Sequence, residues 1–235
     1  MSRQTTPKVE LLAHTGGELI AALAAKLCYS NASIDDLLDK VSTEEQDGFL
    51  SKISQLGHLS VFEHITFSFG IEGVSRVLTH QLVRHRVASY SQKSQRYVAH
   101  KGGFDYVVPP SVEANPAAKA IFDDMMTTLA DTYDKLLQEG ASPEDARYIL
   151  PNACETKIIV TMNARELIHF FKLRCCQRAQ AEIRTLAEMM LKAVLPIAPI
   201  IFAKAGPACI SGACAEGKMT CGKIAEVREH FASLK

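Results

Sequence analysis

The most regular pattern in the chain is an alternation of apolar and polar residues over positions 65–72. The apolar positions are Ile65, Phe67, Phe69 and Ile71, and between them stand Thr66, Ser68, Gly70 and Glu72. A period of two predicts a β-strand with one face in the core and the other face in contact with solvent. Residues 157–162 form a shorter apolar run and predict a second strand.

Helical spacing and helix-end signals cover much of the remaining chain. Ser42 and Glu45 are spaced as a capping box and predict a helix that runs toward Leu56 and stops at Gly57. The other predicted helices cover residues 18–28, 74–84, 115–140, 142–150, 163–174 and about 179–196. The polar run at 88–98 has weak periodicity, and we predict a loop that passes into an extended segment.

No internal repeat and no flexible linker interrupts these elements, so a single α+β domain is the simplest interpretation. Residues 1–205 are expected to form this domain. Residues 206–235, which contain Cys209, Cys214 and Cys221, are expected to be a tail and not an independent domain.

Composition limits the class of protein. The 235 residues are 47% hydrophobic and 22% charged, which is enough apolar material for an ordinary core. A net charge of zero argues against a general nucleic-acid coat. The N-terminus has no signal-peptide pattern, and the apolar segment 193–203 is too short to span a membrane. We therefore expect a cytoplasmic protein without membrane contact, whose seven cysteines are reduced thiols.

The neutral total charge hides a local imbalance at residues 73–104, which contain no Asp or Glu. The basic residues of this stretch are Arg76, Arg84, Arg86, Lys93, Arg96 and Lys101, with His80, His85 and His100. Arginine forks bind phosphate oxygens well, and the hydroxyls of Ser89, Ser91 and Ser94 add small donors. An anion site is one interpretation, and a solvated basic face or an RNA groove are the alternatives.

Within this stretch, Arg84-His85-Arg86 is followed by seven residues and then by Ser94-Gln95-Arg96-Tyr97. This arrangement resembles the signature motif of flavin-dependent thymidylate synthases. Further segments fall in the same family's order and spacing: His58, Phe62-Glu63-His64, the run 146–151, Asn163-Ala164-Arg165, His169, Leu173-Arg174 and Ala179-Gln180. The resemblance extends over roughly residues 10–205.

The resemblance implies a fold, an assembly and a reaction. The fold is a central antiparallel sheet packed by helices, and the assembly is a homotetramer with active sites shared between subunits. The reaction methylates dUMP to dTMP with 5,10-methylenetetrahydrofolate as the one-carbon donor. NADPH reduces bound FAD, the reduced flavin supplies the hydride, and tetrahydrofolate leaves unoxidised.

By the same resemblance, the residues expected to bind the cofactor are Ser60, Arg84, His85, Arg86, Gln92, Asn163, Ala164, Arg165 and His169. Those expected to bind dUMP are Gln81, Leu82, Val83, Arg84, Gln92, Lys93, Ser94, Gln95, Arg96, Arg147 and Arg174. Some family members have Glu where this chain has Gln92, so the side chain brings no charge to nucleotide binding.

The resemblance also implies individual roles. Arg96 and the backbone of residues 94–96 hold the phosphate of dUMP, where charge-assisted hydrogen bonds are strongest. Arg174 is the expected catalytic residue; it lies against the uracil ring and favours its ionised form. His58 lies near the approach of folate and nicotinamide, or is a polar residue at a helix end. Glu63 is either a flavin-side residue or an ion-pair partner, and His169 alone would be interpreted as a core histidine.

Other chemistries have weaker support. A cysteine nucleophile could be Cys154, Cys175 or Cys176, although small buried thiols are commoner. The tail cysteines could bind a metal with Cys176 or a histidine, but their spacing does not fit a common zinc knuckle, and no metal is expected. A dinucleotide-binding GxGxxG motif and a P-loop are absent from the sequence. A non-catalytic nucleotide- or RNA-binding module remains the alternative function.

Overall fold

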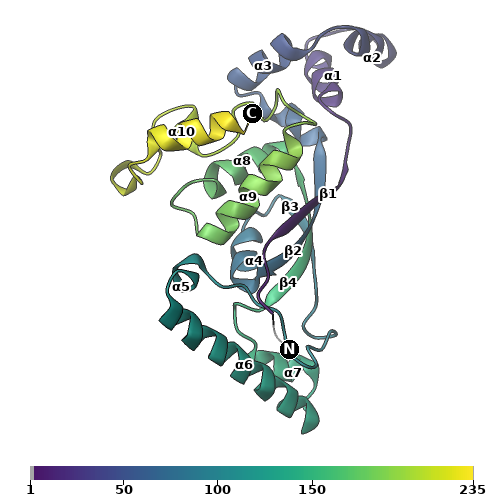
Figure 1. The fold of residues 1–235 in the computed structure, drawn as a ribbon. Helices are drawn as coiled ribbons and strands as arrows, with labels where there is room; N and C mark the ends of the chain where they lie inside the picture. Colours follow the sequence, from purple (N-terminus) through teal and green to yellow (C-terminus); the bar gives the residue numbers. More distant parts are fainter. Residues whose placement is uncertain (1–2, 235) are drawn as a thin grey trace.

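A computed structural model describes residues 3–234 and contains a four-stranded sheet with helices packed around it (Figure 1). The strands follow the spatial order β1-β2-β4-β3, and each neighbouring pair is antiparallel. Their bounds are Lys8–His14 for β1, Thr66–Ser75 for β2, Ala88–Gln92 for β3 and Glu155–Asn163 for β4. The expected α+β fold with a central antiparallel sheet is confirmed.

The helices surround this sheet. The α-helices are α1 Leu19–Leu27, α2 Ile34–Thr43, α3 Asp47–Gln55, α4 Arg76–Leu82, α5 Pro110–Glu113, α6 Pro116–Gln138, α7 Pro143–Ala146, α8 Ala164–Arg174, α9 Ala181–Val194 and α10 Ile224–Ser233. The 3-10 helices are η1 Leu59–His64, η2 Arg147–Ile149, η3 Ala208–Ile210 and η4 Gly217–Met219.

The period-two pattern predicted β2 because its two faces have different surroundings. Phe67 and Phe69 are fully buried, whereas Ser68 lies on the other face and hydrogen-bonds the Thr161 hydroxyl of β4 at 2.7 Å. The pairing of β2 with β4 shifts register between Ile71 and Val74. Gly73 stands at this bulge with φ +72°, and a Cβ there would lie 2.0 Å from the carbonyl oxygen of Thr6, so no larger residue fits.

Several predicted helices are confirmed by their caps. The Asn115 side chain accepts hydrogen bonds from the backbone N–H groups of Ala117 and Ala118 and starts α6, and Gly140 ends it with φ +91°. The Asn163 side chain accepts from the N–H of Glu166 and starts α8. Between α6 and β4, a single α-helical turn and η2 replace the one helix predicted over 142–150.

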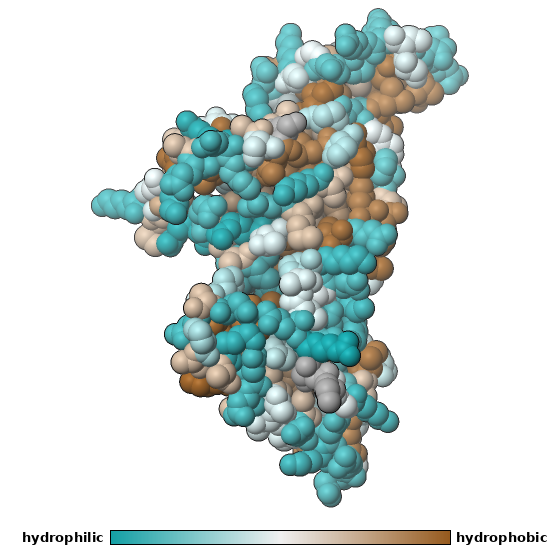
Figure 2. All heavy atoms as spheres, viewed as in Figure 1, coloured by the Kyte–Doolittle hydropathy of each residue, from teal (hydrophilic) through white to brown (hydrophobic). Residues whose placement is uncertain are grey.

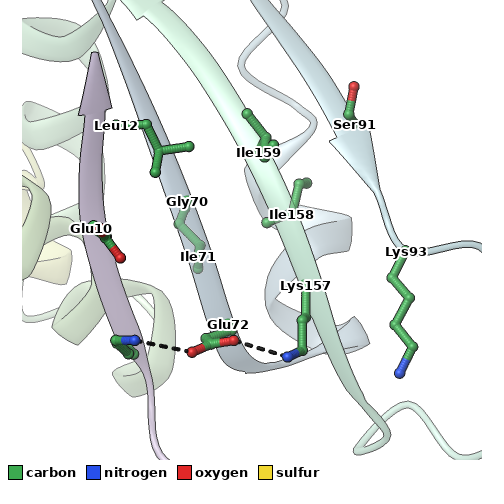
Figure 3. Close-up of a pocket in the computed structure, with 11 residues that line it drawn as sticks. Glu10, Leu12, Gly70, Ile71, Glu72, Ser91, Lys93, Lys157, Ile158 and Ile159 are labelled. Carbon is green, nitrogen blue, oxygen red and sulfur yellow. Dashed lines mark hydrogen bonds and ion pairs between the residues drawn. The ribbon is translucent and has the colours of Figure 1, made fainter. Parts of the chain in front are cut away.

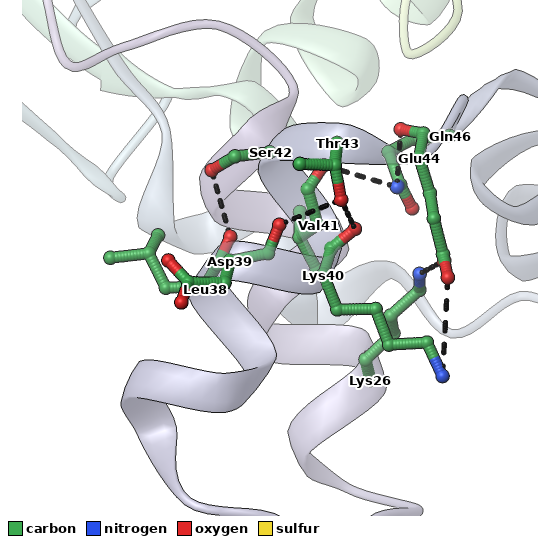
Figure 4. Close-up of polar contacts among 9 residues, drawn as sticks. All are labelled: Lys26, Leu38, Asp39, Lys40, Val41, Ser42, Thr43, Glu44 and Gln46. Carbon is green, nitrogen blue, oxygen red and sulfur yellow. Dashed lines mark hydrogen bonds and ion pairs between the residues drawn. The ribbon is translucent and has the colours of Figure 1, made fainter.

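The capping box predicted at Ser42 is wrong. Ser42 lies in the last turn of α2, a helix that the prediction missed, and its hydroxyl donates to the carbonyl oxygen of Leu38 at 2.7 Å (Figure 4). Helix α3 begins at Asp47 instead. Serine is common at the start of a helix, and it also forms this backward hydrogen bond to the preceding turn. The residue type alone therefore does not show whether Ser42 starts a helix or ends one.

Further elements differ from prediction. Val74 belongs to β2, and Ser75 caps α4 by accepting from the N–H of Leu78. Residues 88–92 form strand β3 and a loop follows it, whereas the prediction placed the loop first and the extended segment after it. Strand β3 is an edge strand that carries Ser and Gln, so it lacks an alternating apolar face. Strand β1 and helix α10 had no predicted counterpart.

The main core lies between the sheet and helices α8 and α9. It includes Phe67, Phe171 and Leu186, and also Val227 and Phe231 of α10. A smaller core, which includes Phe104, Met126 and Cys154, packs along α6, the long helix at the lower end of Figure 1. No helix in the described part of the chain is long and apolar enough to cross a membrane.

Apolar side chains also lie outside these cores. Figure 2 shows a hydrophobic patch over the N-terminal helices, where Leu19, Leu27 and Ile34 are among the exposed large residues. The sheet face that points away from α8 and α9 is open as well. Leu12 and Ile159 on that face are about half exposed, at 50% and 49%. These surfaces are available for contact with other molecules.

Candidate functional site

A buried histidine links the two ends of α8. His85, in the connection between α4 and β3, has its Nδ1 3.1 Å from the carboxylate of Glu166 and its Nε2 3.0 Å from Nε of Arg174. A terminal nitrogen of Arg174 also donates to the carbonyl oxygen of Gln81 at 3.4 Å. We call His85, Glu166 and Arg174 the histidine–arginine cluster.

Helical geometry explains why these residues meet. Glu166, Phe170 and Arg174 are each four positions apart, so they share one face of α8, with the ends about 12 Å apart along the axis. The His85 ring lies edge-on to Phe170, with centroids 4.9 Å apart, and reaches both polar ends of this face. Asn163 caps the helix at Glu166, which fixes the first turn from which Glu166 extends.

The surroundings of the cluster shift its proton equilibria. Burial lowers the pKa of His85, and the charge of Arg174 lowers it further, while the hydrogen bond to Glu166 acts in the opposite direction. Burial also lowers the pKa of Arg174, although an arginine remains charged. The cluster therefore holds a neutral imidazole between a cation and a carboxylate.

His85, Glu166 and His169 resemble a metal-ligand set in spacing. Among residues 3–234 they are the one group of three or more potential ligands whose ligand atoms all lie within 4.8 Å of one another. Both ring nitrogens of His85 are already engaged, one by Glu166 and one by Arg174. The nearby guanidinium also repels a cation, so these contacts disfavour a metal here.

Beside the cluster lies a cavity of about 570 Å³ that brings together several predicted cofactor-binding residues. Its lining consists of Leu59, Glu63, Val87, Asn163, Arg165, Glu166, Ile168, His169 and Lys172. Arg165 forms an ion pair with Glu63 across it. His169 is exposed and lines this cavity, so it is not the core histidine that its apolar neighbours indicate.

The other predicted cofactor residues lie around this cavity in different ways. Ser60 is an exposed residue of η1, next to the lining residue Leu59. Arg84 and Arg86 are exposed on either side of His85, and Nε of Arg84 donates to the carbonyl oxygen of His80 at 3.3 Å. Ala164 is fully buried, and its N–H donates to the Ile65 carbonyl, so its side chain does not reach the cavity.

Beyond the far end of β3, a second group gathers around Glu144. Nε of Arg96 lies 2.8 Å from the Glu144 carboxylate, and Nε of Arg147 donates to the Glu144 backbone carbonyl at 3.1 Å. The Ser94 hydroxyl accepts from the N–H of Arg96 at 3.1 Å. We call Ser94, Arg96, Glu144 and Arg147 the loop cluster.

Three more predicted substrate residues lie close to the loop cluster. Gln92 is half-buried, and its amide donates to the hydroxyls of Thr79 at 3.0 Å and Thr156 at 3.3 Å. The Lys93 N–H donates to the Lys157 carbonyl. The Gln95 amide approaches the sulfur of Cys154 at 3.8 Å.

The predicted residues Gln81, Leu82 and Val83 lie at the C-terminal end of α4, shortly before His85. Gln81 contributes its carbonyl to Arg174, and Val83 is exposed. Leu82 is buried in the core, so its side chain is not available to a ligand. The five-residue strand β3, about 16 Å long, separates these residues from the loop cluster. Along the chain, β3 therefore lies between His85, which bonds Arg174, and Arg96.

A further hollow of about 580 Å³ crosses the open face of the sheet (Figure 3). Glu72 lies between Lys8 and Lys157 and forms ion pairs with both, at 3.3 and 2.9 Å. Lys93 also lines this hollow. It is a shallow surface that crosses four strands, separate from the cavity beside α8.

The cysteines do not form a reactive centre. Cys154 is buried, and burial raises the pKa of its thiol to about 11; burial also raises the pKa of Cys175. A thiol that resists ionisation is a poor nucleophile. Cys209 is buried as well, and the charges of Cys176, Cys214 and Cys221 raise its pKa further. The tail cysteines contribute to no group of three ligands within 4.8 Å in residues 3–234.

Sequence reasoning missed the two carboxylates that organise these clusters. Glu166 was passed over because it stands in the first turn of α8, where an acidic residue is common. Glu144 also stands in the first turn of a helix, α7, where an acidic residue is equally common. Each acts on a basic residue far away in the chain, and one sequence contains no signal for such a pairing.

Comparisons with known proteins agree with this geometry. Residues 10–200 match the family model described as thymidylate synthase complementing protein. A protein of Geobacter sulfurreducens named flavin-dependent thymidylate synthase is 57% identical over 97% of this chain and 99% of its own length. A protein of Clostridium tetani with the same name is 47% identical over 95% of this chain and 96% of its own length.

One solved structure supports the fold. The crystal structure of a UMP/dUMP methylase, PolB from Streptomyces cacaoi, bound with 5-Br dUMP, has a TM-score of 0.76 and 24% identity. It covers 88% of this chain and 98% of the other. With the family match and relatives that span nearly the whole chain, the conclusion is that this protein belongs to the flavin-dependent thymidylate synthase family.

Proposed function

We propose that this protein methylates dUMP to dTMP, with 5,10-methylenetetrahydrofolate as the one-carbon donor and NADPH as the reductant. The methylene group moves to C5 of uracil, a hydride completes the methyl group, and tetrahydrofolate leaves unoxidised. The observation that carries the proposal is a guanidinium, that of Arg174, fixed by a buried histidine beside a cavity lined by Asn163, Arg165 and His169.

The cavity beside α8 fits FAD in its chemistry. Arg165 and Lys172 supply positive charge for phosphates, the Asn163 amide can donate and accept hydrogen bonds, and Val87 and Ile168 offer apolar walls. When bound, FAD supplies the hydride that it takes from NADPH. The residues of this chain hold the cofactor and exclude water from the transfer.

Arg174 is proposed to activate the pyrimidine. A guanidinium against the uracil ring stabilises negative charge as it develops, which makes C5 nucleophilic without covalent attack by the enzyme. The raised pKa of the Cys154 and Cys175 thiols supports a route without a cysteine nucleophile. Arg96, Arg147 and Ser94 are proposed to hold the phosphate of dUMP.

We propose further that the active site is shared between subunits of a homotetramer. Arg174 and the loop cluster lie at opposite ends of β3, so one nucleotide is more readily bound by Arg174 of one chain and Arg96 of another. The open sheet face and the exposed apolar residues of α1 and α2 offer surfaces for such an assembly.

The tail is proposed to complete the same domain. Val227 and Phe231 of α10 belong to the main core, and Arg228 donates to the carbonyl oxygens of Cys209 and Gly212 at 2.9 and 3.0 Å. Through such contacts, residues 206–234 pack against the main core of the domain and do not form a core of their own.

The direct test is dTMP formation from dUMP, methylenetetrahydrofolate and FAD, with and without NADPH, at low oxygen. Product that requires NADPH, together with released tetrahydrofolate, is the expected result. A protein that binds flavin but forms no dTMP has another activity. A protein that binds no flavin would favour the alternative, a non-catalytic nucleotide- or RNA-binding module whose affinity falls steeply with salt.

A further inference from the structure

We propose that Glu166 is a positioning residue for Arg174: it fixes the tautomer of His85 so that the imidazole can hold the guanidinium in place. The proposal rests on the proposed function, because it assigns to Glu166 a task in the reaction that Arg174 promotes. Glu166 also lines the cavity beside α8, and the task proposed here is exerted through its hydrogen bond to His85.

The direction of the hydrogen bonds follows from chemistry. Nε of an arginine always carries a hydrogen, so Arg174 donates and Nε2 of His85 accepts. A neutral imidazole then has its only proton on Nδ1, and this proton is donated to the Glu166 carboxylate at 3.1 Å. The chain of donors runs from Arg174 to His85 to Glu166. Only one tautomer of His85 is compatible with it.

The remaining neighbours of His85 do not select a tautomer. From β3, the Tyr90 hydroxyl donates to the backbone carbonyls of Leu82 and His85, both at 2.8 Å, and so fixes the backbone. From α8, Phe170 packs against the ring and His169 lies edge-on to it, with centroids 5.8 Å apart. The charged and titratable groups that face the ring are thus Glu166, Arg174 and His169. Of these, only Glu166 accepts a hydrogen bond from Nδ1.

Loss of this acceptor has a specific consequence. Without Glu166, the Nδ1–H would be a buried donor without a partner, and this cost favours transfer of the proton to Nε2 against the hydrogen bond from Arg174. An Nε2–H group faces the N–H of Arg174 and repels it. The guanidinium would then leave its hydrogen bond to His85, and turnover would fall while the fold remained intact.

Three variants of the FAD-loaded enzyme separate positioning from other roles. Glu166→Ala removes the acceptor, and Glu166→Gln restores it through the amide oxygen. Glu188→Ala is the matched control, because Glu188 forms a comparable pair with His230 at 2.9 Å, on α9 and α10. The readouts are kcat and KM for dUMP, bound FAD per chain, and the imidazole tautomers from ¹⁵N NMR of histidine-labelled protein.

We expect kcat of Glu166→Ala to fall about 10- to 100-fold with a smaller change in KM, since a hydrogen bond to a charged group is lost. Glu166→Gln should recover most of this loss, and Glu188→Ala should resemble the wild type. In the wild type, His85 should show the Nδ1–H form, and in Glu166→Ala this form should give way to Nε2–H.

Two results would overturn the proposal. One is an Nε2–H tautomer of His85 in the wild type. The other is a Glu166→Ala variant whose kcat is unchanged, or falls only in proportion to lost FAD, with the tautomer unaltered. The tautomer of His85 is measured by NMR without turnover. If the wild type forms no dTMP, the proposed function is rejected, and the effect of Glu166 on the tautomer is still tested by NMR.

Discussion

The histidine–arginine cluster and the loop cluster both present arginines to a ligand, but they hold them differently. His85 is 4% exposed and bonds Arg174 and Glu166 through its two ring nitrogens. In the loop cluster, the side chains of Arg96 and Glu144 are each 47% exposed. One arginine is fixed before any ligand arrives, and the other is held by an exposed carboxylate that a ligand can replace.

The difference matches two tasks. A group that stabilises charge in a transition state is most effective when it needs no rearrangement at the moment of reaction. A phosphate contact in the ground state gains affinity from strong charge-assisted hydrogen bonds. An exposed ion pair such as Arg96–Glu144 contributes only about 0.2–1 kcal/mol, so its exchange for a phosphate costs little. Five predictions test this division.

Arg174→Ala should have the largest effect. Removal of one fixed donor to developing charge typically costs about 100- to 1000-fold in kcat. Bound FAD per chain should remain near the wild-type value, because Arg174 does not line the cavity beside α8. Turnover close to that of the wild type would show that pyrimidine activation lies elsewhere.

Arg96→Ala should weaken dUMP binding and leave kcat less affected. A charge-assisted hydrogen bond contributes about 1.5–3 kcal/mol, so KM for dUMP should rise about 10- to 100-fold. Steady-state kinetics at saturating folate measure this, with Lys101→Ala as a control that removes a neighbouring charge. A large loss of kcat with an unchanged KM would contradict the phosphate role.

Acid should inactivate the enzyme through the histidine–arginine cluster. The pKa of His85 lies below its usual range, so its neutral form prevails above about pH 6.5. The stability that this group contributes is complete above the unfolded-state pKa and is lost as pH falls through the folded-state pKa. Below that pKa, kcat should fall about tenfold per pH unit. A kcat that stays flat across the pH range in which NMR shows His85 becoming protonated would show that protonated His85 still holds Arg174.

Glu144→Gln should change KM for dUMP by a smaller factor than Arg96→Ala does. The substitution weakens the ion pair that occupies Arg96, so KM for dUMP should fall about two- to fivefold. Isothermal titration with dUMP measures the same change directly. Weaker binding in this variant would mean that Glu144 orients Arg96 for the ligand and does not compete with it.

Cys154→Ala should have the smallest effect. Its thiol has a pKa of about 11 and is not needed as a nucleophile, so kcat should remain within about twofold of the wild type. The buried position makes a modest loss of thermal stability the main expected change. Loss of activity in a folded Cys154→Ala variant would instead support Cys154 as a nucleophile.

Local signals in the sequence predicted most of the elements that carry the site. The alternation at 65–72 identified β2 because this strand has one buried and one open face. Asn163 identified the start of α8 through its capping chemistry. The polar edge strand β3 carries no such alternation, and the serine of α2 formed a backward bond where a cap was predicted.

The site was predictable only in part for a related reason. Arginines and histidines of a known motif are visible in the sequence, whereas their partners depend on the fold. His85 and Glu166 are 81 positions apart, and His85 and Arg174 are 89 apart. The burial of Leu82 and Ala164 is likewise a tertiary property, which explains why two predicted ligand contacts have side chains in the core.

The most direct test of the account is intersubunit complementation. Arg174→Ala and Arg96→Ala chains are produced together, and dTMP formation is compared with that of each variant alone. If one nucleotide is held by Arg174 of one chain and Arg96 of another, random mixing should restore about a quarter of the wild-type turnover. The contrary result is a mixed assembly that contains both variants but forms dTMP no faster than either variant alone. Each chain would then supply both Arg174 and Arg96 to its own site, which contradicts a site shared between chains.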